Sequence, residues 1–431
     1  MALLEQLSFF CIGKHKPQTT TNMNKKHGAL LLSSILTLMV FIGNAQTKPA
    51  LDFFFKKGKG FGLVTADSTF SLNFQFRMQN RATYVSKTEG DFDPESFEFR
   101  VRRLRFKFEG FVYDPKLTYY IQLSVSRGDM DWRVTDNSVI NSSPNIVRDA
   151  VLYYSPTKRV RFGLGQTKLP GNRQRVVSSG DQQFVDRSIV NATFNIDRDF
   201  GFFAQYTGKF INLKGALTSG EGRNALPESK SPSNKGLAYT GRVEILPFGK
   251  FTGSNDYIEG DLERESTPKL SIAATYSFND HAVRAAGQLG NDLYQARSID
   301  NFSADLLFKY NGWAFYNEYL KRDVNNPITV SSTDPTKTRH IFVGDGYLTQ
   351  LSYLFKNNFE VAGRLSRITP AAKIEGLEKQ IQQVEIGVTK YLVGHRLKIQ
   401  GNILHQTRND LVTDSYSGGL WSALFQIELG I

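Results

Sequence analysis

Alternation of apolar and polar residues with a period of two dominates the chain beyond about residue 60. Between residues 70 and 79, for example, large apolar side chains alternate with Ser, Asn, Gln and Arg. Successive side chains of a strand point to opposite faces, so each such run predicts a strand with one apolar and one polar face. Runs of about ten residues have the length that a tilted strand needs to cross a bilayer.

The connections between these runs alternate between long and short. Pro156-Thr157 and Asn311-Gly312 are examples of tight connections, whereas the turn near 247–268 is a long exception. Short periplasmic turns and long outer loops are typical of outer-membrane barrels, and a sheet in lipid must close on itself. We therefore predict an all-β protein: a transmembrane antiparallel β-barrel of about sixteen strands with both termini in the periplasm. The predicted strands are 69–79, 97–109, 117–126, 147–155, 158–166, 199–207, 210–218, 237–246, 269–278, 301–310, 313–322, 346–355, 359–367, 381–392, 396–406 and 419–431.

The N-terminal region has the layout of a secretory signal peptide. A basic segment beginning at Met23 precedes an apolar stretch from Gly28 to Ile42, and small residues end at Ala45. The apolar stretch is shorter than the ~20 residues of a membrane-spanning helix, which argues against an anchor. We expect translation to start at Met23 and cleavage to follow Ala45. The predicted parts are an extension and signal peptide (1–45), a short periplasmic segment (46–68) and the barrel (69–431).

Two other classes of protein fit the alternation less well. A secreted β-sandwich or sugar-binding module would have shorter strands and no alternation of long and short connections. An outer-membrane barrel enzyme would need a Ser and His pair near the membrane rim, and no such pair stands out. The sequence contains no metal-binding HExxH, GxSxG or phosphate-loop motif. Its only cysteine, Cys11, precedes the cleavage site, so we predict no catalytic residues, no cofactor and no metal site.

The basic excess indicates what the barrel conducts. The chain has 53 Lys and Arg against 41 Asp and Glu. In the cell envelope such an excess favours small anions or anionic lipid as partners, and we expect no nucleic acid. A row of Arg along a narrow wet pore favours anions, and guanidinium binds phosphate bidentately. The alternative is that these arginines pair with lumen acids such as Glu98, Glu109 and Glu244 and only stiffen the wall.

The segment 97–109 carries the densest run of arginines. Phe97, Phe99 and Val101 share one face, and the apolar residues from Leu104 onward join it only if the register slips at Arg102–Arg103, as in a β-bulge. Arginine facing lipid would cost ~2–4 kcal/mol at the midplane, so we expect these arginines to face the lumen.

The third long connection, about 167–198, is too long for a simple cap, and we expect it to fold inward and narrow the channel. The alternative is a solvated outer loop. We predict that the anion path is lined by Arg77, Arg100, Arg102, Arg105, Arg159, Arg161, Lys168, Arg173, Arg175, Arg187 and Arg198.

Several segments resemble the family of phosphate-selective porins O and P. The resemblance covers about 60–431 and is most specific at Gly165, Gln166, Lys168 and Pro170, followed by the element 178–188 (SSGDQQFVDRS). It implies a sixteen-stranded outer-membrane barrel, usually a homotrimer, with basic residues on the wall and inward loop guiding anions. It also implies partners: small anions such as phosphate, outer-membrane lipid and the barrel-assembly machinery. Barrel-assembly signals mostly end on an aromatic residue, and Ile431 departs from that pattern.

By this resemblance a lumen or constriction role falls to a subset of the predicted residues. A phosphate-selective channel and a general, weakly selective porin both remain open. The subset is Arg100, Arg102, Arg105, Arg161, Lys168 and Arg187.

Overall fold

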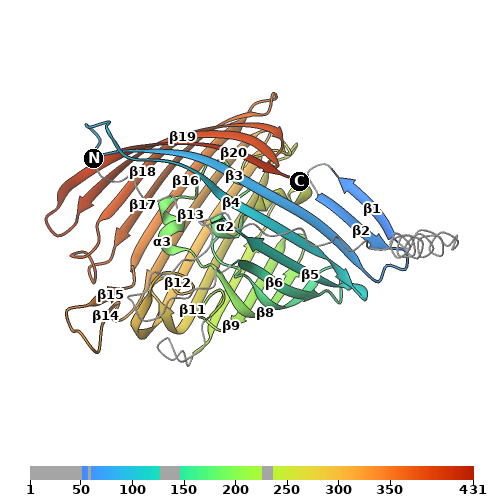
Figure 1. The fold of residues 1–431 in the computed structure, drawn as a ribbon, viewed down its shortest axis with the longest axis horizontal. Coiled ribbons are helices and arrows are strands. Elements are labelled where there is room, and N and C mark those ends of the chain that lie inside the picture. Colours follow the sequence, from blue (N-terminus) through green and yellow to red (C-terminus); the bar gives the residue numbers. More distant parts are fainter. Residues whose placement is uncertain (1–50, 57–59, 127–145, 226–235) are drawn as a thin grey trace, which may run out of the picture. The chain divides into compact units, whose positions relative to one another are not determined.

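The computed structural model describes residues 51–56, 60–126, 146–225 and 236–431. The predicted signal peptide and Cys11 lie outside the described residues. Sixteen antiparallel strands, each hydrogen-bonded to the next, form a barrel that closes where β20 pairs with β3. Figure 1 shows these strands tilted around a common axis. The predicted fold class is therefore confirmed, and each predicted strand overlaps one observed strand.

The bounds of the barrel strands are as follows. They are β3 (Ser71–Ser86), β4 (Pro94–Val112), β5 (Asp114–Ser124), β6 (Val147–Tyr154), β7 (Val160–Lys168), β8 (Arg198–Thr207), β9 (Ile211–Thr218), β10 (Ala238–Ile245), β11 (Lys269–Arg284), β12 (Asp292–Tyr310), β13 (Trp313–Asp323), β16 (Gly344–Leu354), β17 (Phe359–Pro370), β18 (Gln380–Val393), β19 (Leu397–Asp410) and β20 (Ser415–Gly430).

A hairpin precedes the barrel within the segment that we expected to be a short periplasmic stretch. Its strands are β1 (Leu51–Lys56) and β2 (Gly60–Thr65), and β2 pairs with the first residues of β3. β20 pairs with β3 from residue 77 onward, so the two strands share the edge of β3. Two further short strands, β14 (Ile328–Val330) and β15 (Thr338–His340), form a hairpin in the loop after β13.

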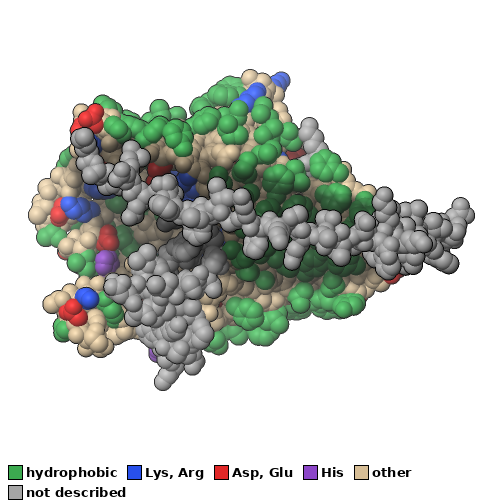
Figure 2. Space-filling model, viewed as in Figure 1, with side chains coloured by type: hydrophobic (Ala, Val, Ile, Leu, Met, Phe, Trp, Pro, Cys, Tyr) green, Lys and Arg blue, Asp and Glu red, His purple; other side chains and the backbone are tan. Residues whose placement is uncertain are grey.

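The two faces of the wall differ as the alternation predicts. Phe200 and Phe202 on β8 point outward with more than half of their surface exposed, whereas Gly201 between them is buried. Hydrophobic side chains cover much of the surface seen in Figure 2. On β4 the register with β3 shifts between Val101 and Arg103, which leaves Arg102 as the extra residue. This bulge confirms the predicted slip and keeps arginine on the lumen side.

The connections at the two ends of the barrel differ in length. We call the end with the tight connections, such as the one between β12 and β13, the turn end, and the opposite end the loop end. Asn311 and Gly312 both have positive φ (48° and 90°), as a two-residue hairpin turn requires. The long connection 246–268 at the turn end contains η2 (Thr252–Tyr257). It enters the barrel, because Lys309 on the lumen face of β12 donates to the carbonyls of Asn255 and Ile258.

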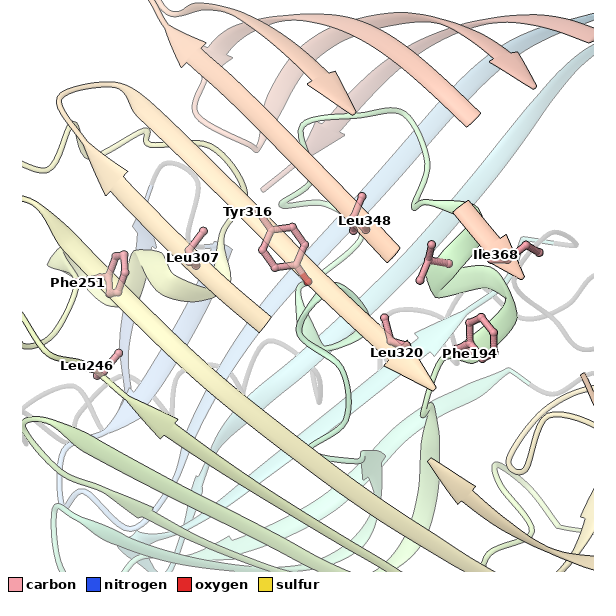
Figure 3. Packing of buried hydrophobic residues seen from close by; sticks show 9 residues of the cluster. Phe194, Leu246, Phe251, Leu307, Tyr316, Leu320, Leu348 and Ile368 are labelled. Carbon is pink, nitrogen blue, oxygen red and sulfur yellow. The ribbon is translucent and has the colours of Figure 1, made fainter. Parts of the chain in front are cut away.

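The third long loop, 169–197, also lies inside the barrel, as we expected. It contains α2 (Arg173–Val176) and α3 (Ile189–Phe194). Val190 and Phe194 of α3 pack in one cluster with the lumen-facing Leu320, Leu348 and Ile368, as Figure 3 shows for the labelled members. The lumen beside β13, β16 and β17 is therefore a packed interior and not open water. In the described part of the chain, no helix has the length and apolar character to cross a membrane.

Gly346 on β16 makes room for α3, because a Cβ atom there would lie 2.8 Å from both the Phe194 ring and Val190. We predict that Gly346→Leu displaces the third loop at a cost of about 1–3 kcal/mol and raises single-channel conductance. Gly363→Leu is the matched control, since nothing lies within 4 Å of a Cβ at Gly363. Equal conductance in the two variants would show that this contact does not hold the loop.

Candidate anion pathway

The third loop is tied to the strands on both sides of the barrel seam. Arg77 donates to the hydroxyl of Ser179 (2.7 Å), and Arg81 pairs with Asp186 (2.7 Å). Lys398 on β19 donates to the carbonyl of Gly180 (2.9 Å). These bonds hold the middle of the loop against β3 and β19.

A buried ion-pair cluster fixes the start of the loop on the opposite wall. The Arg173 guanidinium donates to Asp305 (2.5 Å) and to the hydroxyl of Ser271 (2.7 Å). Arg242 donates to the same Asp305 carboxylate (2.7 Å) and to Glu244 (2.8 Å). Two buried guanidinium groups thus face two buried carboxylates, so this part of the lumen carries little net charge.

Between these anchors a cavity of about 160 Å³ is lined by basic side chains. We call its nine basic residues the basic cluster. Among the described residues no acidic side chain lines the cavity. The basic cluster comprises Arg102, Arg103, Arg105, Arg148, Lys168, Arg175, Arg187, Arg198 and Arg223, from β4, β6, β7, β8, the third loop and the loop after β9.

Three carboxylates pair with the rim of the basic cluster. Asp149 accepts two hydrogen bonds from Arg198 (3.0 and 3.1 Å). Asp197 pairs with Arg175 (2.5 Å) as well as with Arg198 (3.3 Å). Asp186 lies 3.6 Å from Arg103. Nine basic side chains therefore surround the cavity, and these three carboxylates lie beside them.

Two cations of the cluster are held by main-chain carbonyls instead. Lys168 Nζ donates to the carbonyl of Val176 (2.5 Å). Arg187 donates to the carbonyls of Gln174 (2.8 Å) and Val177 (2.7 Å). A carbonyl fixes the position of a cation without cancelling its charge. No ion pair within the described ranges includes either side chain.

Titration behaviour on the third loop reflects this concentration of charge. Burial lowers the pKa of Arg187, and the neighbouring cations Arg175 and Arg103 lower it further. Arginine keeps its proton at neutral pH, and the contribution of Arg175 and Arg103 to the shift shows that other cations lie close to it. Burial alone would raise the pKa of Asp197, but Arg175, Arg198 and Arg223 bring it well below the ordinary value of a carboxyl group. The charges of these neighbouring cations favour any anion that enters.

The structure gathers six of the eleven predicted path residues in the basic cluster. They are Arg102, Arg105, Lys168, Arg175, Arg187 and Arg198.

The other five lie elsewhere. Arg77 adjoins the cluster through Ser179, and Arg161 lines the next cavity toward the turn end. Arg100 is exposed and pairs with Glu98 (3.3 Å), and Arg159 lies exposed in the turn between β6 and β7. Arg173 belongs to the buried cluster around Asp305 and does not line the basic cavity.

Three members of the basic cluster were not among the eleven. Arg103 was weighed only as an alternative to Arg102, because the exact position of the bulge decides which of them faces inward. Arg148 and Arg223 lie next to long loops, where alternation gives no signal. Gly220 and Gly222 precede Arg223, and their amides donate to the Asp199 carboxylate (2.7 and 3.1 Å). That turn places Arg223 at the cluster.

The acids named in the alternative interpretation do pair with basic side chains. Glu98 pairs with Arg100, Glu109 with Lys107 (2.9 Å) and Glu244 with Arg242 (2.8 Å). None of the three lines the basic cavity. The wall-stiffening interpretation therefore describes these three pairs.

The chain thus forms a closed barrel in which an inward-folded loop helps to line a basic cavity. The sequence model of the family "phosphate-selective porin O and P" matches residues 72–363. The chain belongs to this family. It is thus a porin channel of the outer membrane. No curated protein matches the chain.

Solved structures share the fold at low sequence identity. The anion-selective porin from Comamonas acidovorans is 11% identical with a TM-score of 0.54, covering 84% of this chain and 100% of that one. The channel DcaP of Acinetobacter baumannii is 12% identical (TM-score 0.52; 86% and 100% covered). OmpF of Salmonella typhi in complex with daunomycin is 13% identical (TM-score 0.52; 88% and 100% covered). Within the described ranges of this chain, no group of His, Cys, Asp and Glu could hold a metal ion.

Asp197 offsets part of the positive charge of the basic cluster. We predict that Asp197→Asn makes the channel more anion-selective, with the chloride-to-potassium permeability ratio rising roughly twofold or more, since a neighbouring charge is lost in a site of low dielectric. The measurement is the zero-current potential in a KCl gradient. Asp334→Asn, in the exposed turn before β15, serves as the control. An unchanged ratio in Asp197→Asn would mean that ions do not sense the cluster.

Proposed function

We propose that this porin allows passive diffusion of small anions, phosphate among them, through the basic cluster. The observation that carries the proposal is the pair Lys168 and Arg187. Both side chains are fixed by carbonyls within the third loop, and both face a cavity lined by seven further cations. An anion that loses water in this cavity meets fixed charges that replace its hydration.

Geometry supports phosphate as a favoured anion. Guanidinium groups present paired donors that match two oxygens of a phosphate, and the basic cluster supplies eight of them from five separate segments of the chain. Groups held by a rigid wall and a docked loop do not need to reorganise when the ion arrives. A hydrated potassium ion meets the same charges as a barrier.

A general porin with weak selectivity is the second candidate. The observation in its favour is that Asp149, Asp186 and Asp197 each pair with arginines at the rim of the cluster. If these carboxylates cancel most of the positive electrostatic potential of the basic cluster, chloride and phosphate would pass with little preference. Only conduction measurements separate the two functions.

Removing Lys168 or Arg187 tests the proposal. We expect Lys168→Gln and Arg187→Gln each to raise, by about tenfold, the phosphate concentration that halves the chloride current, because each removes one charge-assisted contact. The measurement is single-channel chloride current in a planar bilayer with added phosphate.

Arg159→Gln is the matched control, because Arg159 lies exposed in a turn outside the cluster. The wild-type channel and this control should respond alike to phosphate. Absence of phosphate block in the wild type would leave the general porin as the function. Equal loss of block in all three variants would show that the overall charge, and not the cluster, sets the response.

We further infer how the channel reaches the outer membrane and that it assembles as an oligomer there. Export by the signal peptide ending at Ala45, insertion by the barrel-assembly machinery and a homotrimer in outer-membrane lipid follow from the resemblance to the family. The trimer predicts a mass of about three mature chains for the detergent-solubilised protein by light scattering, after subtraction of bound detergent, and each mature chain is lighter than the 48.6 kDa of the full sequence by the residues up to Ala45. A mass of one chain would contradict it.

A further inference from the structure

A second chamber lies next to the basic cluster on the side of the turn end. It consists of two adjoining cavities of about 520 and 230 Å³, and Tyr153, Arg161, Thr167 and Lys168 line both. Lys168 also lines the basic cavity, so this side chain is common to the cluster and the chamber. We call it the turn-side vestibule. Its lining differs in kind from that of the cluster.

Aromatic side chains face this vestibule. Tyr120 of β5, Tyr153 of β6 and Phe203 of β8 line it. Tyr153 is flanked along its strand by Leu152 and Tyr154, which point outward with about half of their surface exposed (50% and 49%). The alternation therefore places the Tyr153 ring on the lumen side.

The wall is shaped to hold that ring. A Cβ atom at Gly163 would lie 2.8 Å from two ring carbons of Tyr153, so only glycine lets the ring rest against β7. The Arg161 guanidinium lies 5.1 Å from the centre of the same ring. Tyr153 is thus in contact with the wall and carries a stacked cation.

The vestibule also offers cations that can receive an anion. No ion pair in the described part of the chain includes Arg161 or Lys168. The acids that line the chamber already have partners: Glu109 binds Lys107 (2.9 Å), and Asp149 binds Arg198 (3.0 Å) and the hydroxyl of Thr167 (3.1 Å). The vestibule therefore combines an aromatic surface with two basic side chains that form no ion pair within the described residues.

Aromatic side chains in the wall do not assist the conduction of inorganic anions. The face of an aromatic ring carries partial negative charge, which disfavours a bare chloride or phosphate. A stacked pair of ring and guanidinium instead suits a planar group that carries an anionic substituent. Cavities of this size with aromatic walls and a few charged groups are typical of small-molecule sites.

We propose that the turn-side vestibule binds small organic anions in which an aromatic ring carries a phosphate or carboxylate group. The ring stacks on the Tyr153–Arg161 pair, and the anionic group reaches Lys168. The inference rests on the proposed anion-conducting function and narrows its substrate class. It makes Tyr153 a specificity-determining residue that the conduction of inorganic ions does not need.

The test compares matched blockers of the chloride current through the full-length channel in a planar bilayer. Phenyl phosphate and methyl phosphate carry the same anionic group, as do benzoate and acetate, and only one member of each pair has a ring. We expect phenyl phosphate to block at a concentration about fivefold lower than methyl phosphate, as an added aromatic contact would give. The carboxylate pair shows whether the preference extends beyond phosphate.

The variant Tyr153→Leu keeps an apolar side chain but removes the ring. It should bring the ratio between phenyl and methyl phosphate close to one while leaving the block by methyl phosphate unchanged. Tyr154→Leu, one residue along and facing outward, should keep the wild-type ratio. A heat-modifiable gel shift confirms that each variant forms a folded barrel.

The outcomes separate this inference from the proposed function. Equal block by phenyl and methyl phosphate in the wild-type channel overturns the inference and leaves an inorganic-anion porin. A ratio that persists in Tyr153→Leu, or that falls equally in Tyr154→Leu, also overturns it. If no phosphate compound blocks and the channel prefers cations, the proposed function fails together with the inference.

Discussion

The closure of the sheet between β20 and β3 is the constraint on which the rest of the structure depends. Lipid offers no hydrogen-bond partners, so every strand edge at membrane depth must be paired. Closure forces one face of each strand to be apolar and leaves the other face to line the interior. It also fixes the circumference, which is too wide for wall side chains alone to fill. The interior must therefore be filled or left wet, and this chain does both.

The filled part and the wet part have different chemistry. On the side of β12, β13, β16 and β17, α3 packs on apolar lumen residues, and the connection 246–268 enters from the turn end. This half resembles the core of a soluble protein. The arginines that lie in it, such as Arg173 and Arg242, share the carboxylate of Asp305. The basic cluster and the vestibule lie along the wall from β4 to β9, so the proposed path for ions lies on that side.

The alternation of residues predicted most of the fold and about half of the site. Strands are visible in sequence because lipid and lumen impose opposite polarity on neighbouring residues, and even the bulge at Arg102 left a break in the pattern. The cluster was harder to predict. The role of a charged side chain in the lumen depends on the group that it binds there, and the sequence does not reveal that group. Arg173 and Arg187 lie on the same loop, yet one meets a buried carboxylate and the other meets carbonyls. Arg148 and Arg223 were not predicted because they lie at or within loops. The hairpin β1–β2 was not predicted because its segment is too short for the alternation to be recognised.

The central claim of the proposed function is that the fixed basic side chains of the basic cluster decide which ions pass. The zero-current potential of the wild-type channel between two KCl solutions of different concentration measures this directly, because its sign reports the more permeant ion. We predict a potential of the sign set by chloride, and its magnitude should decrease as the salt concentration rises and screens the cluster. A potential of the sign set by potassium would contradict the account, even though the barrel itself would stand.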